Sequence, residues 1–111
     1  MATPGKRDLL PGTLDMLVLK TLTAQPMHGY GIAQHIQRLS HDVLRVEEGS
    51  LYPALQRLRQ KGLIKAAWGQ TPNNQRARYY TLTAAGQRAL GEQEASFAEL
   101  LDAIARVMRT T

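Results

Sequence analysis

Scarce or missing residue types exclude several classes of site in this 111-residue chain. It contains no cysteine, so disulfides, thiolate metal ligands and cysteine nucleophiles are ruled out. Aromatic residues make up only 5% of the chain, too few for a stacking platform that binds single-stranded nucleic acid. No apolar run has the length of a membrane span, and the N-terminus lacks the apolar stretch of a signal peptide, so we expect a cytoplasmic protein.

Catalytic and metal-binding patterns are missing too. The spacings of His28, His35 and His41 fit no pair of helical ligands at i and i+4, and no clustered carboxylates join them. We expect His28 to be a structural residue in the turn before a helix. Neither a phosphate-cradling glycine motif nor GxSxG occurs, so the sequence predicts no enzyme, no cofactor and no metal site.

The charge balance is positive, with 14 Lys and Arg against 9 Asp and Glu and a net charge of +5. An anionic partner fits this balance. Nucleic acid is the first candidate, because the sequence contains no basic amphipathic helix of the kind that binds a membrane surface. Many small basic proteins are merely soluble, however, so the pattern of residues has to decide. The length predicts one domain with a modest core.

The stretch from 47 to 64 is the most informative part of the chain and predicts a helix. Leu51, Leu55 and Leu58 recur at i, i+4 and i+7 and mark an apolar face. The opposite face is polar and contains no acid. It holds Pro53, Gln56, Arg57 and Gln60. Such a face suits base edges in a DNA major groove, although an ordinary solvated helix has the same pattern.

Two further helices are predicted before this stretch. The first has Pro11 in its first turn, Thr13 as its expected cap and Gln25-Pro26 as its end. Its apolar positions are Leu14, Leu17, Val18 and Leu22. After a turn at 27–31, Ile32 and Ile36 begin the apolar face of the second helix. Residues 43–46 predict a brief strand or an extended link.

A β-hairpin is predicted after the central helix. Segments 63–68 and 76–83 have strand composition and flank a stretch of turn-forming residues. Alternation along the second strand puts Arg78 and Tyr80 on one face and Tyr79 on the other. Trp68 is expected to pack in the hairpin, or else to stack on an aromatic ligand.

The last predicted helix is unusually long. Thr83 is its expected cap, and a length of about 25 residues spans roughly 38 Å. Its apolar stripe, interrupted at Glu94, extends beyond a small domain and predicts a dimer seam; the alternative is that the helix folds back onto its own domain. The seam residues are Leu90, Phe97, Leu100, Leu101, Ile104, Val107 and Met108.

This order of elements predicts a mainly α fold with a small β-hairpin: a winged helix-turn-helix followed by a long C-terminal dimerisation helix. The expected divisions are a mobile arm at 1–8, a DNA-binding head at 9–83 and the dimerisation helix at 84–111. Lys6 and Arg7 on the arm are candidate phosphate contacts, with fraying as the alternative.

Four motifs in order resemble the PadR family of transcriptional regulators. They are LLPGTLDMLVL at 9–19; HGYGI at 28–32; EGSLYPAL at 48–55 with RL at 57–58 and GLI at 62–64; and RYY at 78–80 with LT at 82–83 and Gly86. The resemblance implies a dimeric repressor with a winged-helix head, released from DNA when a small molecule or another signal is sensed. A single helix after the hairpin resembles the short subgroup of the family.

Candidate DNA contacts follow from the chemistry of the central helix. Ser50 and Tyr52 can donate to phosphates, and Gln56 can pair with the adenine edge. Pro53, expected in the first turn, can press against thymine methyls. Arg57 and Gln60 are candidates for base edges or backbone. For Tyr52 the alternative is a half-buried packing residue.

The hairpin supplies a second group of candidates. Arg76 and Arg78 are expected beside the DNA backbone, with Lys65 as an extra phosphate contact. Asn74 and its amide neighbours at the tip can enter a minor groove, unless the tip is disordered. Met16 and Phe97 are candidate linings of a ligand pocket, the alternative being ordinary core positions.

These expectations together predict a sequence-specific repressor that binds a palindromic operator in double-stranded DNA as a homodimer. The resemblance adds a response to a ligand or another signal, with a small molecule as a candidate effector. The alternative is a winged-helix adaptor that uses the same basic surface to bind an acidic protein. Falling affinity for duplex with added salt, together with a preference for a palindrome, would separate the two.

Overall fold

The computed structural model describes residues 11–110, and within them the mainly helical fold with a small sheet is confirmed. The elements run in the order α1 (Pro11–Thr21), β1 (Met27–His28), α2 (Gly29–Leu39), α3 (Glu48–Gln60), β2 (Ile64–Gln70), β3 (Arg76–Leu82) and α4 (Ala84–Arg109). The predicted arm, with Lys6 and Arg7, lies outside the described residues.

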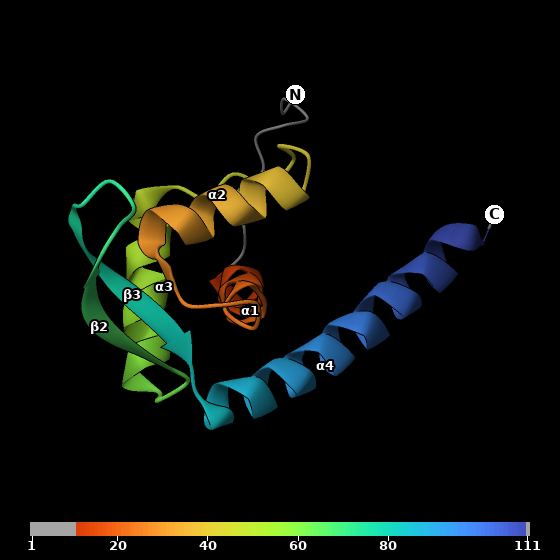
Figure 1. Cartoon of the computed structure of the whole chain (residues 1–111). Helices are drawn as coiled ribbons and strands as arrows, with labels where there is room; N and C mark the ends of the chain where they lie inside the picture. Colours follow the sequence, from red (N-terminus) through yellow and green to blue (C-terminus); the bar gives the residue numbers. More distant parts are fainter. Residues whose placement is uncertain (1–10, 111) are drawn as a thin grey trace.

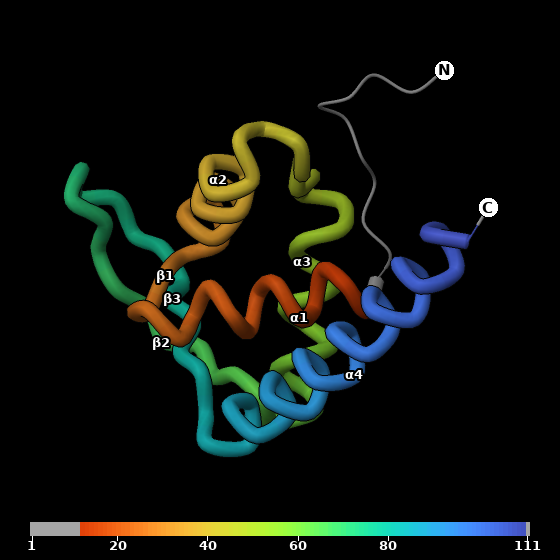
Figure 2. Tube along the Cα trace, turned by 90° about the vertical axis from the view of Figure 1, so that its right-hand side faces the viewer, coloured from red at the N-terminus to blue at the C-terminus, as the bar shows by residue number. Residues whose placement is uncertain are grey.

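Helix α1 lies at the centre of the head. Figure 1 looks along it, with α2 above, α3 and the hairpin to one side and α4 below; Figure 2 shows it crossing the middle of the molecule. It contacts α2, α3 and α4. Its residues Val18 and Leu19 are fully buried, as is Ile32 of α2. The apolar stripes read from the sequence therefore converge on one core.

The segment before α2 differs from its prediction as a turn. Met27 and His28 form the short strand β1, which pairs with Tyr80 and Tyr79 of β3, so the sheet has the order β1-β3-β2. Two residues are too few to show the alternation that marks a strand. The structural role expected for His28 is confirmed, because its Nδ1 accepts a hydrogen bond from the Gly31 N–H at 3.0 Å and caps α2.

The ends of α1 also differ from expectation. Thr13 is the third residue of the helix and not its cap, and α1 ends at Thr21 instead of reaching Gln25-Pro26. The hydroxyl of Thr21 donates to the Leu17 carbonyl at 2.8 Å, and turn hydrogen bonds from the Thr23 and Ala24 N–H groups continue the end of the helix. Local hydrogen bonds of this kind close a helix before its breaker residues are reached.

Thr83 joins the hairpin to α4. As predicted, it caps the helix: its Oγ1 accepts from the Gly86 N–H at 3.0 Å, and its hydroxyl donates to the Gly62 carbonyl at 2.7 Å. The second bond ties the start of α4 to the end of α3. Gly62 itself has a φ of +73°, the left-handed conformation that glycine accepts at a helix end. The direction in which α4 leaves the head is therefore set by contacts on both sides of Thr83.

Helix α4 has two halves with different surroundings. Leu90 is 4% exposed and packs in the head's own core, so its prediction as a seam residue is wrong. Phe97 is half-buried against the same core. Beyond it the helix projects from the head (Figure 1). Its large apolar residues there are exposed: Leu100, Leu101, Ile104, Val107 and Met108.

Two glycines of α4 give a matched test of this packing. A Cβ on Gly86 would collide with the Leu63 carbonyl oxygen and lie 2.6 Å from Leu82 Cδ1, whereas one on Gly91 would meet nothing within 4 Å. We expect Gly86→Ala to lower the free energy of unfolding by about 1–3 kcal/mol. Gly91→Ala should raise it by about 0.5–1 kcal/mol. Urea denaturation followed by circular dichroism measures both; equal effects would contradict the close approach at Gly86.

Candidate nucleic-acid interface

Helix α3 presents one apolar and one polar face. Leu51, Leu55 and Leu58 are each 1% exposed and pack in the core with α1. Because they occupy one side of the helix, the residues on the opposite side are directed outward. The exposed residues of the outer face include Gly49, Ser50, Tyr52, Pro53, Gln56 and Gln60. The structure thus brings five of the six predicted contacts on this helix to one surface.

Arg57 is the exception among the predicted contacts. Its Nη2 donates to Asp15 Oδ1 of α1 at 2.9 Å, and the Asp15 side chain is only 10% exposed. A guanidinium that donates to a nearly buried carboxylate forms a charge-assisted hydrogen bond and links α3 to α1. The geometry gives Arg57 a role inside the head, which the helical spacing alone did not indicate.

Pro53 lies deeper in α3 than predicted. The helix begins at Glu48, so Pro53 belongs to its second turn and not its first. Proline has no N–H to donate to the carbonyl four residues earlier, here that of Gly49. Both Gly49 and Pro53 are exposed, so water can satisfy this carbonyl. The proline ring therefore remains on the outer surface despite the interrupted hydrogen-bond pattern.

Tyr52 combines the two roles that the sequence left open. It is 46% exposed, yet its phenol ring closes over the start of α2, since a Cβ on Gly29 would lie 2.8 Å from the Tyr52 hydroxyl oxygen. The absence of a side chain at Gly29 makes this approach sterically allowed. Tyr52 thus packs with one side of its ring and leaves the other side to solvent.

The hairpin presents a basic face. Strand register pairs Trp68 with Arg78 and Gln70 with Arg76, so these side chains share one face of the sheet. Trp68 is 59% exposed and packs against arginines instead of the core: the guanidinium carbons of Arg76 and Arg78 lie 4.3 and 5.6 Å from its ring centroid. The two arginines that are predicted to contact the DNA backbone therefore lie side by side on this face.

The other two predicted hairpin contacts lie on the opposite face and at the tip. Lys65 pairs with Thr81, which places its side chain on the opposite face of the sheet. Asn74 is exposed at the tip with a φ of +65°, a left-handed conformation that asparagine tolerates in turns. The structure therefore separates Lys65 from the α3 face.

A cleft of about 660 Å³ connects the hairpin to the helices. Arg76, Arg78 and Trp68 line it on one side, and Tyr52 of α3 lines it on the other. It also brings in Tyr30 and Gln34 of α2, which sequence reasoning missed; the Gln34 Nε2 donates to the Tyr30 hydroxyl at 2.8 Å. The available signal was their i, i+4 spacing on the side of α2 away from its buried isoleucines.

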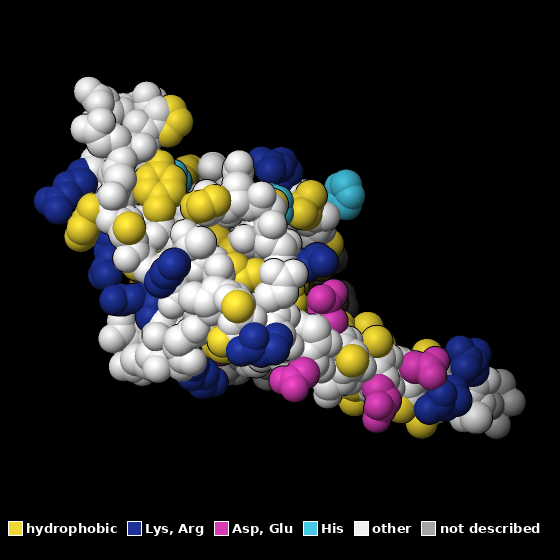
Figure 3. Space-filling view, turned by 60° about the horizontal axis from the view of Figure 1, so that its bottom comes forward, with side chains coloured by type: hydrophobic (Ala, Val, Ile, Leu, Met, Phe, Trp, Pro, Cys, Tyr) yellow, Lys and Arg dark blue, Asp and Glu magenta, His cyan; other side chains and the backbone are white. Residues whose placement is uncertain are grey.

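The charge distribution follows the same division. Residues 49–83 contain six Lys and Arg and no Asp or Glu. On the face shown in Figure 3, Lys and Arg side chains line the edge of the head below the hairpin tip, and acidic side chains gather on and beside α4. A positive potential over α3 and the hairpin attracts polyanions to this end of the molecule.

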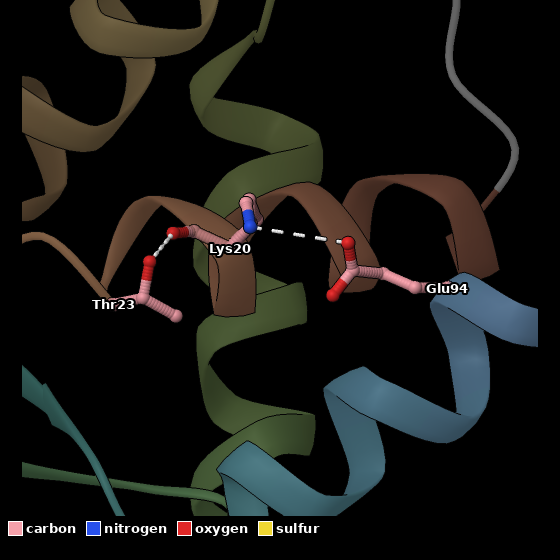
Figure 4. Close-up of polar contacts among 3 residues, drawn as sticks. All are labelled: Lys20, Thr23 and Glu94. Carbon is pink, nitrogen blue, oxygen red and sulfur yellow. Dashed lines mark hydrogen bonds and ion pairs between the residues drawn. The ribbon is translucent and has the colours of Figure 1, made fainter.

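A second cavity lies between α1 and α4. It has a volume of about 710 Å³, and the structure brings both predicted pocket residues, Met16 and Phe97, to its wall. Gln93 and Leu100 of α4 line it as well. On the neighbouring flank, Lys20 Nζ of α1 lies 3.9 Å from Glu94 Oε2 (Figure 4). Glu94, which interrupts the apolar stripe, therefore faces a lysine of α1 in an exposed ion pair.

The described residues include neither a cluster of metal ligands nor a membrane-spanning helix. From Pro11 to Thr110, no group of three or more His, Asp or Glu side chains is arranged to hold a metal ion. Over the same range, every helix is too short or too polar to cross a membrane.

Three helices, a basic hairpin and an acid-free outer face on the third helix define a winged helix-turn-helix regulator of transcription. The sequence model of the PadR-like family of transcriptional regulators matches residues 18–92, and the chain belongs to this family. The family assignment favours a regulator over an enzyme.

Similar proteins support the assignment along nearly the whole chain. A PadR family transcriptional regulator from Eggerthella lenta is 32% identical, with a TM-score of 0.77 over 90% of this chain and 85% of that one. A transcriptional regulator from Clostridium thermocellum is 26% identical, with a TM-score of 0.76 over 89% and 95%. An uncharacterised protein of Lysinibacillus sphaericus is 29% identical over 89% of this chain and 91% of its own.

The ion pair between α1 and α3 can be tested with a double-mutant cycle. We expect Asp15→Ala and Arg57→Ala each to lower the free energy of unfolding, because each leaves the partner's charge unpaired in a partly buried site. The double variant should lose less than the sum, with a coupling energy of about 1–2 kcal/mol. Urea denaturation of the four proteins gives this energy; additive losses would show that the contact does not stabilise α3.

Proposed function

We propose that this chain is a sequence-specific DNA-binding repressor that acts as a homodimer on a palindromic operator. The observation that carries the proposal is that one cleft joins the acid-free, exposed face of α3 to the arginine pair of the hairpin, with Tyr52 on one side and Arg76 and Arg78 on the other. A helix of this kind enters a major groove while the adjacent basic hairpin follows the backbone.

The residues of this surface divide into two roles. Gln56 is exposed on α3 and carries the amide that can pair with an adenine edge in two hydrogen bonds, while Pro53 beside it offers an apolar surface to thymine methyls. Ser50 and Tyr52 supply hydroxyl donors, and Arg76 and Arg78 supply charge, to phosphates. The contacts to bases distinguish one DNA sequence from another, and the contacts to phosphates supply affinity and register.

Homodimerisation is proposed from the projecting half of α4. Leu101, Ile104 and Met108 are 51%, 48% and 76% exposed, a larger apolar surface than one helix of a stable monomer normally leaves to solvent. A second copy covers it most simply, because two identical stripes are self-complementary about a two-fold axis. The same axis relates two α3 helices that would read half-sites about one turn of duplex apart.

The pocket between α1 and α4 is the proposed effector site. Its apolar residues Met16, Phe97 and Leu100 suit an apolar or aromatic ligand, and Gln93 adds an amide. Because α4 carries both this wall and the proposed seam, a ligand held here would act on the angle between the two heads.

Two single variants should separate the proposed roles. Gln56→Ala should weaken preference for an operator selected from random duplex, by about 1–3 kcal/mol per half-site, with little change in binding to random duplex. Arg78→Ala should weaken binding to both duplexes alike and lower the salt slope by about 1 for each protomer. Fluorescence anisotropy at several salt concentrations measures both variants.

This comparison also tests the adaptor alternative. In an adaptor, Arg78→Ala would lower the affinity for the acidic protein partner, and the wild-type chain would show no preference among duplex sequences. Equal losses on operator and random duplex for both variants would refute the division of roles.

The dimer requires separate variants. Leu101→Asp and Ile104→Asp should each give monomers that bind the operator at least about tenfold more weakly, because a charge in an apolar seam has no partner. Ala95→Asp is the control: it is exposed and lies nine residues from Ile104, about 180° around the helix. Sedimentation velocity would reject the seam if the Leu101 and Ile104 variants remained dimers.

A further inference from the structure

Trp68 is an unusual residue on this surface. It is the single tryptophan of the chain, it is 59% exposed, and it lies toward the outer end of β2 instead of over the core. The buried part of the same sheet face is made by Ile64 and Tyr80. Single exposed apolar residues are common on protein surfaces, so only the neighbours of this indole can explain a role for it.

The neighbours of Trp68 supply this explanation. Arg76 and Arg78 are two residues apart on β3 and so share one face, with their Cα atoms about 7 Å apart along the strand. Like charges on neighbouring positions of one face repel each other, and residues 49–83 contain no carboxylate to offset them. The ring of Trp68 lies within cation–π distance of both guanidinium groups, and its negative face attracts each of them.

Arg78 is held by packing and not by hydrogen bonds. Its Nε is buried and has no hydrogen-bond partner among the described residues, and no salt bridge engages the group there. The same arginine lines the cleft opposite Tyr52. Its remaining donors are therefore free for an anion, while contact with the indole restricts the side chain's conformations.

We propose that Trp68 is a positioning residue that arranges Arg76 and Arg78 to bind the phosphates of one DNA strand at the cleft. This inference rests on the proposed function. Arginine side chains lose considerable conformational freedom when they bind, and an array ordered beforehand loses less. Trp68 acts through the two arginines, so it raises affinity for duplex DNA of any sequence and leaves base preference to α3.

The experiment compares Trp68→Ala and Trp68→Phe in the full chain, with an operator selected from random duplex and with random duplex as probes. Trp68→Ala should weaken binding to both about tenfold and lower the salt slope toward that of Arg76→Ala/Arg78→Ala. Trp68→Phe, which keeps an aromatic face, should recover most of the affinity and of the slope. The melting temperature measured by circular dichroism should change little, because Trp68 is outside the core.

A double-mutant cycle distinguishes positioning from direct contact. If Trp68 acts through the arginines, Trp68→Ala should cost little more once Arg76 and Arg78 are both alanine. A full additional loss in that background would mean that the indole itself contacts DNA, and would overturn the inference. So would unchanged affinity of Trp68→Ala, or a loss that follows the melting temperature.

Failure of the inference and failure of the proposed function give different results. If the wild-type chain selects no operator from random duplex, the proposed function fails before Trp68 is tested. If it selects one and Trp68→Ala binds that operator as tightly as the wild type, only the inference fails. Because the chain has one tryptophan, a change in its emission on adding duplex would independently report binding at the hairpin.

Discussion

The burial of the leucine stripe of α3 against α1 is the constraint on which the rest of the surface depends. Leu51, Leu55 and Leu58 are almost completely buried, and truncating such a residue typically costs about 2–5 kcal/mol. With that face committed to the core, the opposite face can only point outward. The ion pair between Arg57 and Asp15 adds a polar contact to the same junction. The polar residues of α3 are thereby presented on a rigid support.

Helix α1 connects this surface to the rest of the protein. It packs against α2, α3 and α4, and one side of it forms a wall of the cavity next to Phe97. A displacement of α4 has to be accommodated by α1, and Asp15 joins α1 to α3 directly. Thr83 provides a further link through its bonds to the Gly62 carbonyl and the Gly86 N–H. Helix α4 is therefore connected to α3 in two places, through α1 and through Thr83.

The sequence predicted those features that depend on periodicity and local chemistry. The stripe of α3, the alternation along β3 and the cap at Thr83 all agree with the structure, because each is decided by near neighbours. The sequence did not predict β1, because a strand of two residues is too short to show an alternating pattern. Leu90 was assigned to the seam because a stripe does not reveal where along a helix the head ends.

Most residues of the candidate site could be predicted from the sequence, but their contacts with other parts of the chain could not. Exposed positions of α3 followed from the helical spacing, and the basic return strand followed from its residues. The contact of Arg57 with a carboxylate 42 positions earlier has no local signal. Neither has the cleft that joins Tyr30 to the hairpin. Long-range contacts of this kind depend on how elements pack, which a single sequence does not specify.

The most direct test of the central claim is hydroxyl-radical footprinting of the protein on the DNA immediately upstream of its own reading frame. If two outward-facing α3 helices and their hairpins bind one duplex, each strand will show two protected segments about one helical turn apart, related by a two-fold axis. Protection that is uniform along the fragment, or confined to one unpaired segment, would contradict the account.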